Sequence, residues 1–222
     1  MFKPGVPEDR PLTVQFCAND PDILLAAAKL VENDCDAVDI NLGCPQGIAK
    51  KGNYGSFLLE KKDLIVSMVK KLKAELKVPV TCKIRCLPTE KQTLELALAI
   101  QEAGASLLTV HGRCKEHNKH LVGSANYAII RKIKETLSIP VIVNGGVGTN
   151  FSEAERAIEM TGCDGVMSSE GILEYPALFD SRGTFDMDEL VSEYLDLYEA
   201  YPYEASLKSV KSHLFSFLYQ GL

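Results

Sequence analysis

The sequence predicts an α/β fold with parallel strands, a (β/α)8-type barrel that is short by about two βα units of roughly 30 residues each. Short, mostly apolar segments alternate six times with helical patterns, which is typical of parallel βαβ units. Polar residues then stand at or just past the end of five of these segments: Asn41, Lys83, His111, Asn144 and Ser168. A doubly wound sheet also fits the count of six, but only a barrel brings all such ends to one mouth. The barrel is therefore the favoured fold.

The six units follow one another from Leu12 to Phe179. Two of the helical segments end on glycines, Gly104 and Gly162, which are common stop signals at helix C-termini. The expected strands cover residues 12–16, 37–42, 78–84, 106–111, 139–144 and 163–169, and the segments that follow them cover 21–32, 61–76, 91–104, 126–137, 151–162 and 175–179.

The pattern changes after Asp180, where two helical segments, 185–201 and 205–220, follow with no strand between them. We therefore expect two domains. Residues 1–182 form the partial barrel, and residues 183–222 form the start of a C-terminal helical domain.

The composition is that of an ordinary globular protein, with 46% hydrophobic and 24% charged residues in 222. No apolar run approaches the roughly 20 residues that a membrane helix needs, and the polar, proline-containing start is unlike a signal peptide. Seven cysteines without a framework spacing indicate a reducing compartment. We expect a cytoplasmic protein, with the nucleus as a second location, and no contact with membranes.

Two further functions are disfavoured by composition. Cys82 and Cys86 lie close together, but no histidine stands near enough to complete a zinc site, so no metal is expected. A net charge of −6 argues against a broadly basic nucleic-acid-binding surface. The sequence does not predict the oligomeric state.

The stretch from Asp36 to Leu59, "DAVDINLGCPQGIAKKGNYGSFLL", places Cys44 just past the end of a strand, between Gly43 and Pro45. Most cysteines are small buried hydrophobic residues. A thiol in a glycine-rich loop with no second cysteine nearby is instead placed to meet a substrate. Cys44 is therefore a candidate functional residue, whereas Cys17, Cys35, Cys82 and Cys163 are expected to be structural.

Six segments follow one another from Leu12 to Phe179: "VQFCAND", "DINLGCPQGIAKKGNYGSFLL", "PVTCKIR", "LLTVHGR", "IPVIVNGG" and "GVMSSEGILEYPALF". In their order and spacing they resemble the tRNA-dihydrouridine synthase family, and most closely its eukaryotic branch that acts on positions 16 and 17 of the D-loop. The family has two strands before the one at Leu12 and a longer C-terminal helical domain, so the chain resembles a shortened form or fragment.

The resemblance implies an FMN-dependent reductase that converts uridine in tRNA to 5,6-dihydrouridine, with NADPH as reductant. Hydride from reduced FMN reaches C6 of the uracil ring, and a proton must reach C5. Cys44 matches the family's proton donor. A cysteine thiol suits this role because it is mostly protonated at neutral pH and can still give up its proton.

The resemblance also implies which residues hold the flavin ring. Gln15, at the end of the first strand, would hydrogen-bond the ring, and His111 would contact it. Lys83 stands in an otherwise apolar strand, where a lysine must reach solvent or meet an anion. By the resemblance it lies beside the flavin, where a cation stabilises negative charge on the reduced ring.

Two loops are expected to hold the FMN phosphate. Glycines allow backbone N–H groups to approach a phosphate closely. Many family members have glycine and arginine where this chain has serine and glutamate, so the contact here would come from backbone N–H groups and a serine hydroxyl, with the glutamate pointing away. The expected residues are Asn144, Gly145 and Gly146 in the first loop and Ser169 and Glu170 in the second.

Binding tRNA requires contacts with phosphates and extrusion of the target base. The candidate residues lie in two loops at the predicted mouth: Lys50 and Lys51, and Arg113, Lys115 and Lys119. Since the net charge is acidic, the longer helical domain of the family would supply most of the basic surface. Two alternatives stay open, a non-catalytic truncated form of such an enzyme and a phosphate-binding barrel enzyme acting on a small metabolite.

Overall fold

A computed structural model describes residues 9–117, 123–201 and 206–218. The chain divides into two compact units. The first contains residues up to Gly145 together with Ile158–Val166, and the second contains Gly146–Ala157 and Met167–Leu222. The predicted domain boundary between residues 182 and 183 falls inside the second unit and stays a prediction.

Six parallel strands form one sheet in sequential order, β1-β2-β3-β4-β5-β6. Sequential order is what consecutive βα units of a (β/α)8 barrel give, whereas a doubly wound sheet reverses direction at a switch point. The partial barrel predicted from the sequence is therefore confirmed. The strands are β1 (Thr13–Phe16), β2 (Ala37–Leu42), β3 (Val80–Cys86), β4 (Leu107–Cys114), β5 (Val141–Asn144) and β6 (Gly165–Met167).

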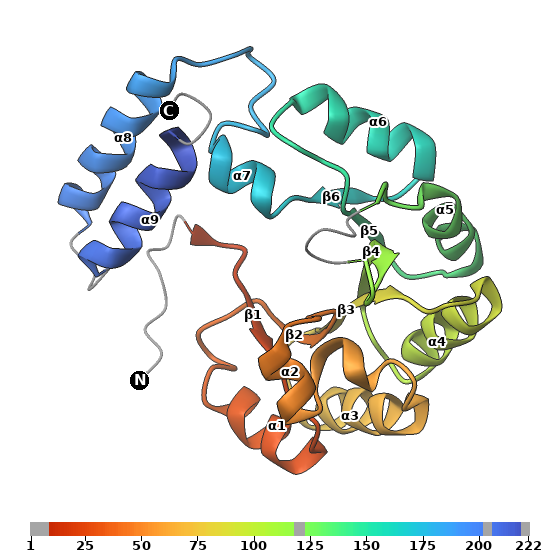
Figure 1. Ribbon diagram of the computed structural model, residues 1–222. Coiled ribbons are helices and arrows are strands. Elements are labelled where there is room, and N and C mark those ends of the chain that lie inside the picture. The colour runs from red at the N-terminus through yellow and green to blue at the C-terminus, as the bar shows by residue number, and fades with distance from the viewer. Residues whose placement is uncertain (1–8, 118–122, 202–205, 219–222) are drawn as a thin grey trace. The chain divides into compact units, whose positions relative to one another are not determined.

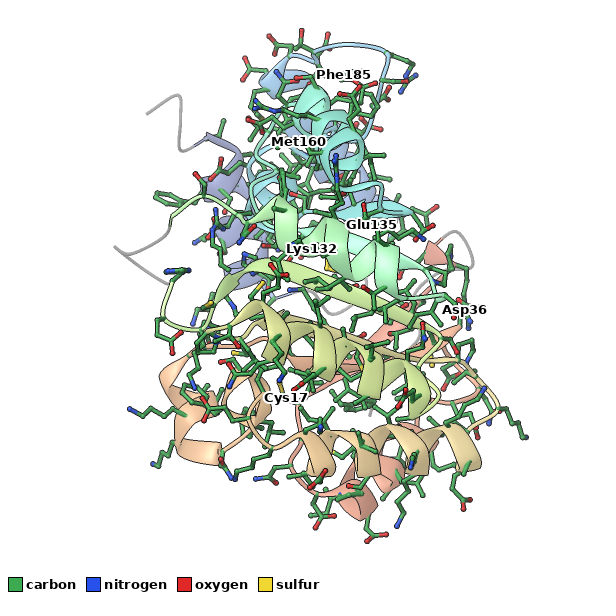
Figure 2. The ribbon with its side chains drawn as sticks, turned by 90° about the vertical axis from the view of Figure 1, so that its right-hand side faces the viewer. Cys17, Asp36, Lys132, Glu135, Met160 and Phe185 are labelled. Carbon is green, nitrogen blue, oxygen red and sulfur yellow. The ribbon has the colours of Figure 1, made fainter. Side chains whose placement is uncertain are left out.

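The connecting helices of the first unit lie along one side of the sheet (Figure 1). They pack on one another in chain order, α1 on α3, α3 on α4 and α4 on α5, which requires a common face. Figure 2 views this layer, with the exposed Lys132 and Glu135 on the outer side of α5. These helices are α1 (Pro21–Lys29), α3 (Lys62–Glu75), α4 (Glu90–Glu102) and α5 (Tyr127–Thr136). The next helix, α6 (Phe151–Thr161), begins in the second unit and ends in the first, with the division after Ala157.

The hydrophobic core lies between this helical layer and the sheet. Alternate strand residues such as Val38, Ile40 and Leu42 are fully buried, and so are Ile65 and Leu72 on α3. Since successive strand residues point to opposite faces, the intervening residues form the other face of the sheet. That second face is polar, contrary to the expectation of almost wholly apolar strands. It carries Gln15, Asp39, Asn41, Thr81, Lys83, Arg85, Thr109, His111 and Asn144.

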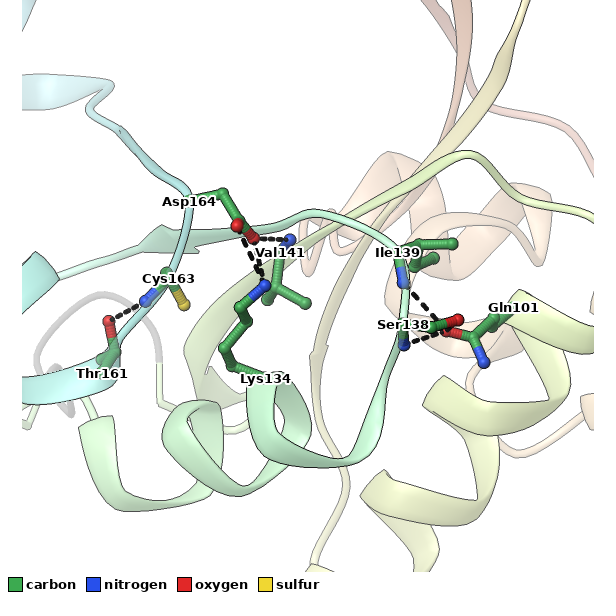
Figure 3. Close-up of polar contacts among 8 residues, drawn as sticks. All are labelled: Gln101, Lys134, Ser138, Ile139, Val141, Thr161, Cys163 and Asp164. Carbon is green, nitrogen blue, oxygen red and sulfur yellow. Dashed lines mark hydrogen bonds and ion pairs between the residues drawn. The ribbon is translucent and has the colours of Figure 1, made fainter.

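The other end of the sheet, where the strands begin, is held by side chains that bind backbone N–H groups (Figure 3). Oε1 of Gln101 accepts hydrogen bonds from the amide N of Ser138 at 2.7 Å and of Ile139 at 3.1 Å. Oδ2 of Asp164 accepts one from the amide N of Val141 at 2.7 Å and pairs with Nζ of Lys134 at 2.7 Å. These contacts connect α4, α5, β5 and the segment before β6.

We expect Asp164→Ala to lower the free energy of unfolding by about 1 kcal/mol, because a backbone N–H loses its charged acceptor at a partly exposed site. The hydrogen bond from Lys134, followed by the one from Val141, lowers the pKa of the Asp164 carboxyl. This stabilisation is therefore present above the pKa of the unfolded chain and is lost as pH falls through the lower folded value. Urea unfolding at neutral and acidic pH measures both effects. Asp164→Asn keeps an acceptor for Val141, and a loss as large as that of alanine would contradict the assignment.

Besides the first part of α6, the described residues of the second unit form α7 (Glu170–Glu174), α8 (Met187–Ala200) and α9 (Leu207–Leu218). The helix after β6 was predicted over residues 175–179, but α7 begins and ends earlier. Its last turn stops at Tyr175, because a residue that precedes a proline avoids helical geometry. Helices α8 and α9 agree with the sequence pattern and meet through Tyr194, whose hydroxyl lies 2.9 Å from Nδ1 of His213. No helix in the described ranges is long and apolar enough to cross a membrane.

Candidate active site

The loop after β2 holds Cys44 by its backbone on both sides. The amide N of Cys44 donates to Oδ1 of Asn41 at 3.0 Å, and its carbonyl accepts from the buried Oγ of Ser56 at 2.9 Å and from the Ser56 amide N at 3.1 Å. Two short helices shape the rest of the loop, α2 (Gly47–Gly52) and the 3₁₀ helix η2 (Gly55–Leu58). Gly55 has φ +63°, and a Cβ there would lie 2.8 Å from the Cys44 carbonyl O. The glycine thus allows η2 to pack directly on the cysteine backbone.

A buried carboxylate, Asp39, lies at the centre of the polar face. Its register neighbours are Gln15 on β1 and Thr81 on β3. Gln15 donates from Nε2 to Oδ2 of Asp39 at 2.7 Å, and Thr81 donates from Oγ1 to Oδ1 at 2.6 Å. Burial raises the pKa of Asp39, against the lowering effect of these two hydrogen bonds and of Lys83.

The hydrogen bonds continue from this row to the cysteine loop. Nδ2 of Asn41 donates to Oε1 of Gln15 at 2.7 Å, and Oδ1 of Asn41 accepts from the amide N of both Gly43 and Cys44 at 3.0 Å. Two predicted site residues, Gln15 and Cys44, are thus joined through a single asparagine. Asn41 also pairs in register with Lys83.

Lys83 is half-buried on the polar face. Its Nζ forms no hydrogen bond or ion pair with any described residue. Burial, followed by the nearby charge of Arg85, lowers its pKa to about 8, although Asp39 acts in the opposite direction. From the sequence, a lysine at this position must reach solvent or meet an anion. A partly desolvated amine fits a ligand that develops negative charge.

His111 on β4 is neutral at physiological pH. Burial, followed by the positive charges of Arg85, Lys83 and Arg113, lowers its pKa to about 3. Its Nε2 lies 3.3 Å from Nη1 of Arg113. Because a guanidinium can only donate, Nε2 accepts this bond and the ring proton resides on Nδ1. His111 can therefore contact a ligand but is a poor source of protons.

Gly145, directly after β5, packs against this histidine. It has φ +91°, and a Cβ there would lie 2.4 Å from Cδ2 and 2.6 Å from Nε2 of His111. The hydroxyl of Tyr127 donates to the Gly145 carbonyl at 3.0 Å and fixes the turn. Asn144, which precedes it, is buried and pairs in register with His111.

We expect Gly145→Ala to lower the free energy of unfolding by about 2–4 kcal/mol, since it adds left-handed strain to a steric clash with the imidazole. Chemical unfolding measures the loss. Gly47→Ala is the matched control, because a Cβ at Gly47 meets no atom within 4 Å, and it should be close to neutral. Equal stability of the two variants would contradict the close packing of Gly145 on His111.

Arg85 connects the loops that follow β2 and β4. Its Nε donates to the Gly43 carbonyl at 2.8 Å, and its Nη1 donates to the carbonyls of Cys114 at 3.1 Å and His117 at 3.3 Å. The structure therefore gathers Gln15, Cys44, Lys83 and His111 at the carboxyl ends of adjacent strands in the first unit, where barrel enzymes carry their active sites.

The second unit contains the remaining predicted residues, Gly146, Ser169 and Glu170. Ser169 and Glu170 are exposed where α7 begins. The neighbouring Oγ of Ser168 is buried and has no hydrogen-bond partner among the described residues. A Cβ on Gly171 would lie 1.9 Å from the carbonyl O of Gly148, so the two loops of this unit touch. An unpartnered hydroxyl beside close-packed glycine loops fits a phosphate group.

The basic residues predicted to contact tRNA have different surroundings. Lys50 and Lys51 are exposed in the last turn of α2. Arg113 donates to the Gly123 carbonyl at 2.5 Å, and Lys115 pairs with Glu60 at 2.6 Å. Lys119 lies outside the described residues.

Sequence reasoning missed three residues of the site, Asp39, Thr81 and Arg85. Their signal was the alternation of polar and apolar residues in "AVDINL" and "VTCKIRC", which marks a polar face at period two. The mostly apolar composition of these segments hid that alternation.

Two solved structures share the fold. A proposed dihydrodipicolinate synthetase from Pseudomonas aeruginosa is 16% identical, with a TM-score of 0.51 over 91% of this chain and 79% of that one. QR15, an aldolase, is 19% identical, with a TM-score of 0.50 over 81% and 70% of the two chains. At such identities the likeness supports the TIM-type barrel architecture alone.

Sequence relatives are much closer. A mouse protein named as a tRNA-dihydrouridine(16/17) synthase-like protein is 46% identical over 97% of this chain and 45% of its own length. The tRNA-dihydrouridine(16/17) synthases of Saccharomyces cerevisiae and Schizosaccharomyces pombe are 45% and 44% identical, with 53% and 56% of their lengths covered. The chain thus spans about half the length of these curated relatives. The sequence profile described as dihydrouridine synthase (Dus) matches residues 4–219, and the chain belongs to the dihydrouridine synthase family.

Proposed function

We propose that the protein takes part in the FMN-dependent reduction of uridine to 5,6-dihydrouridine in tRNA, at positions 16 and 17 of the D-loop, with NADPH as reductant. The observation that carries this proposal is the arrangement of Cys44, Gln15, Lys83 and His111 around one polar face in a chain of this family. The relatives named above are synthases for positions 16/17, and their names include NAD(P)(+).

The residues of the site suit separate tasks in this reaction. A bound reduced flavin supplies the hydride. Cys44 delivers the proton to C5 of uracil, since His111 is neutral and its Nε2 already accepts from Arg113. Gln15 offers an amide to a planar heterocycle, and Lys83 offers an amine without an anion partner in the described structure.

The phosphate of FMN calls for backbone N–H groups and hydroxyls near Asn144, Gly145, Gly146, Ser169 and Glu170. The unpartnered Oγ of Ser168 supports this assignment. We therefore propose the buried Ser168, in place of the exposed Ser169, as the source of the hydroxyl. The exposed side chain of Glu170 lies at the first position of α7.

The test uses the 222-residue chain purified after expression. The proposal expects bound FMN near one per chain and dihydrouridine in tRNA incubated with NADPH, measured by nucleoside mass spectrometry. FMN binding without dihydrouridine would favour a non-catalytic form. If a small phosphate compound but not FMN raised the melting temperature, the protein would instead be a barrel enzyme for a phosphorylated metabolite.

A further inference from the structure

We propose that Asp39 is a positioning residue, whose carboxylate fixes the orientation of the Gln15 amide and, through Asn41, the loop that carries Cys44. This role rests on the function proposed above, because it acts on the residues assigned to flavin contact and proton delivery.

The hydrogen bonds from Asp39 to the Cys44 loop can be arranged in only one way, because the donor and the acceptor of each bond are fixed. An ionised carboxylate only accepts hydrogen bonds, so the Gln15 amide must turn its nitrogen toward Asp39, at 2.7 Å. The Gln15 oxygen is then left for Nδ2 of Asn41, also at 2.7 Å. Asn41 in turn presents its oxygen to the two loop N–H groups at 3.0 Å.

The groups at the two ends of this series of hydrogen bonds require the same orientation of the Gln15 and Asn41 amides. The backbone N–H groups of Gly43 and Cys44 only donate, and Asp39 only accepts, so neither amide can rotate by 180° without placing like groups against each other. The chain therefore leaves one N–H and one oxygen lone pair of Gln15 in defined positions for a ligand. It also holds the backbone of Cys44 at a defined place above the sheet.

The surroundings of Asp39 hold its carboxylate in one position, so that it can serve as a fixed acceptor for Gln15. The residue is 6% exposed, it sits in the middle of three paired strands, and both its oxygens accept hydrogen bonds. Thr81 holds the oxygen that Gln15 does not use, which prevents the carboxylate from rotating.

The experiment measures alkylation of each cysteine by iodoacetamide, resolved by peptide mass spectrometry, in the full chain without FMN or tRNA. Asp39→Ala, Gln15→Ala and the double variant form a double-mutant cycle. We expect each single variant to raise the alkylation rate of Cys44 by about threefold or more, and the double variant to raise it no further, because both residues act through the same chain of bonds.

Two variants separate positioning from general packing. Asp39→Asn can still present an oxygen to Gln15 and an amide to Thr81, so it should keep the wild-type rate at Cys44. Thr81→Val removes one restraint on the carboxylate but leaves the bond between Asp39 and Gln15 in place, so it should raise the rate less than Asp39→Ala does. Additive effects in the cycle, or an increase in Asp39→Asn equal to that in Asp39→Ala, would overturn the proposal.

The buried Cys35 and Cys163 report whether a variant stays folded. If Asp39→Ala exposes them, Gln15→Ala and Asn41→Ala decide, since both break the chain while keeping Asp39 and Thr81 paired. An unchanged Cys44 rate in these two would refute the positioning role. Alkylation needs no substrate, so it tests the positioning role separately from the reaction. If the cycle is non-additive as expected but no dihydrouridine forms, the positioning role stands and only the proposed function is rejected.

Discussion

Cys44→Ala is expected to lower the rate of dihydrouridine formation by at least about 100-fold, the usual contribution of a general acid. Reduction of bound flavin by NADPH should continue at the wild-type rate, because that step needs no proton from the thiol. Single-turnover kinetics measure the two steps separately. The loop should survive the change, since its contacts with Asn41 and Ser56 involve only the backbone of Cys44.

Cys17→Ala is the matched control for this experiment. Cys17 is an exposed thiol directly after β1, the neighbouring strand. The control should keep most of the activity. Equal loss of flavin reduction and uridine reduction in Cys44→Ala, or equal loss of turnover in both variants, would remove Cys44 from its role as proton donor.

Lys83→Met is expected to stabilise the fold and to impair the site. The pKa of Lys83 is lowered from 10.5 to about 8, so keeping the amine charged at neutral pH costs roughly 3 kcal/mol. A methionine of similar length removes that cost, and we expect an increase in the free energy of unfolding of up to about 3 kcal/mol at pH 7. If the proposed function holds, FMN retention should fall, because the cation assigned to the flavin ring is lost.

The pH dependence gives an independent check. Between about pH 8 and 10.5 the unfolded chain binds more protons at this lysine than the folded chain does, so wild-type stability should rise with pH over that window. The variant should lack this rise. Lys70→Met, an exposed lysine on α3, should change stability by no more than about 0.5 kcal/mol. A Lys83→Met variant with unchanged stability and unchanged flavin content would contradict both the expected gain in stability and the expected loss of FMN.

The barrel-type fold could be predicted from the sequence because strand and helix segments alternate, and the two differ in length and in the spacing of their apolar residues. Glycine signals placed the ends of α4 and α6 correctly, since Gly104 has φ +106° and Gly162 has φ +68°. The helix after β6 was misplaced because the apolar stretch from Tyr175 to Phe179 resembles a helix, whereas Pro176 prevents one from continuing through it.

Only part of the candidate site could be predicted from the sequence. Residues at strand ends, such as Cys44 and His111, could be identified by position. Asp39 could not be identified in this way, because its role depends on partners on two neighbouring strands. The sequence of one segment does not determine how that segment pairs with its neighbours. The lowered pKa of His111 likewise depends on burial and then on three cations from β3 and β4, and all of these arise only in the folded chain.

The guanidinium of Arg85 has a mechanical consequence. It holds the Gly43 carbonyl beside the thiol loop and the Cys114 and His117 carbonyls of the next loop at the same time. Neither segment can shift without disturbing its charge-assisted bond to Arg85. Their displacements are therefore coupled, and any molecule that immobilises one rim segment also restrains its neighbour.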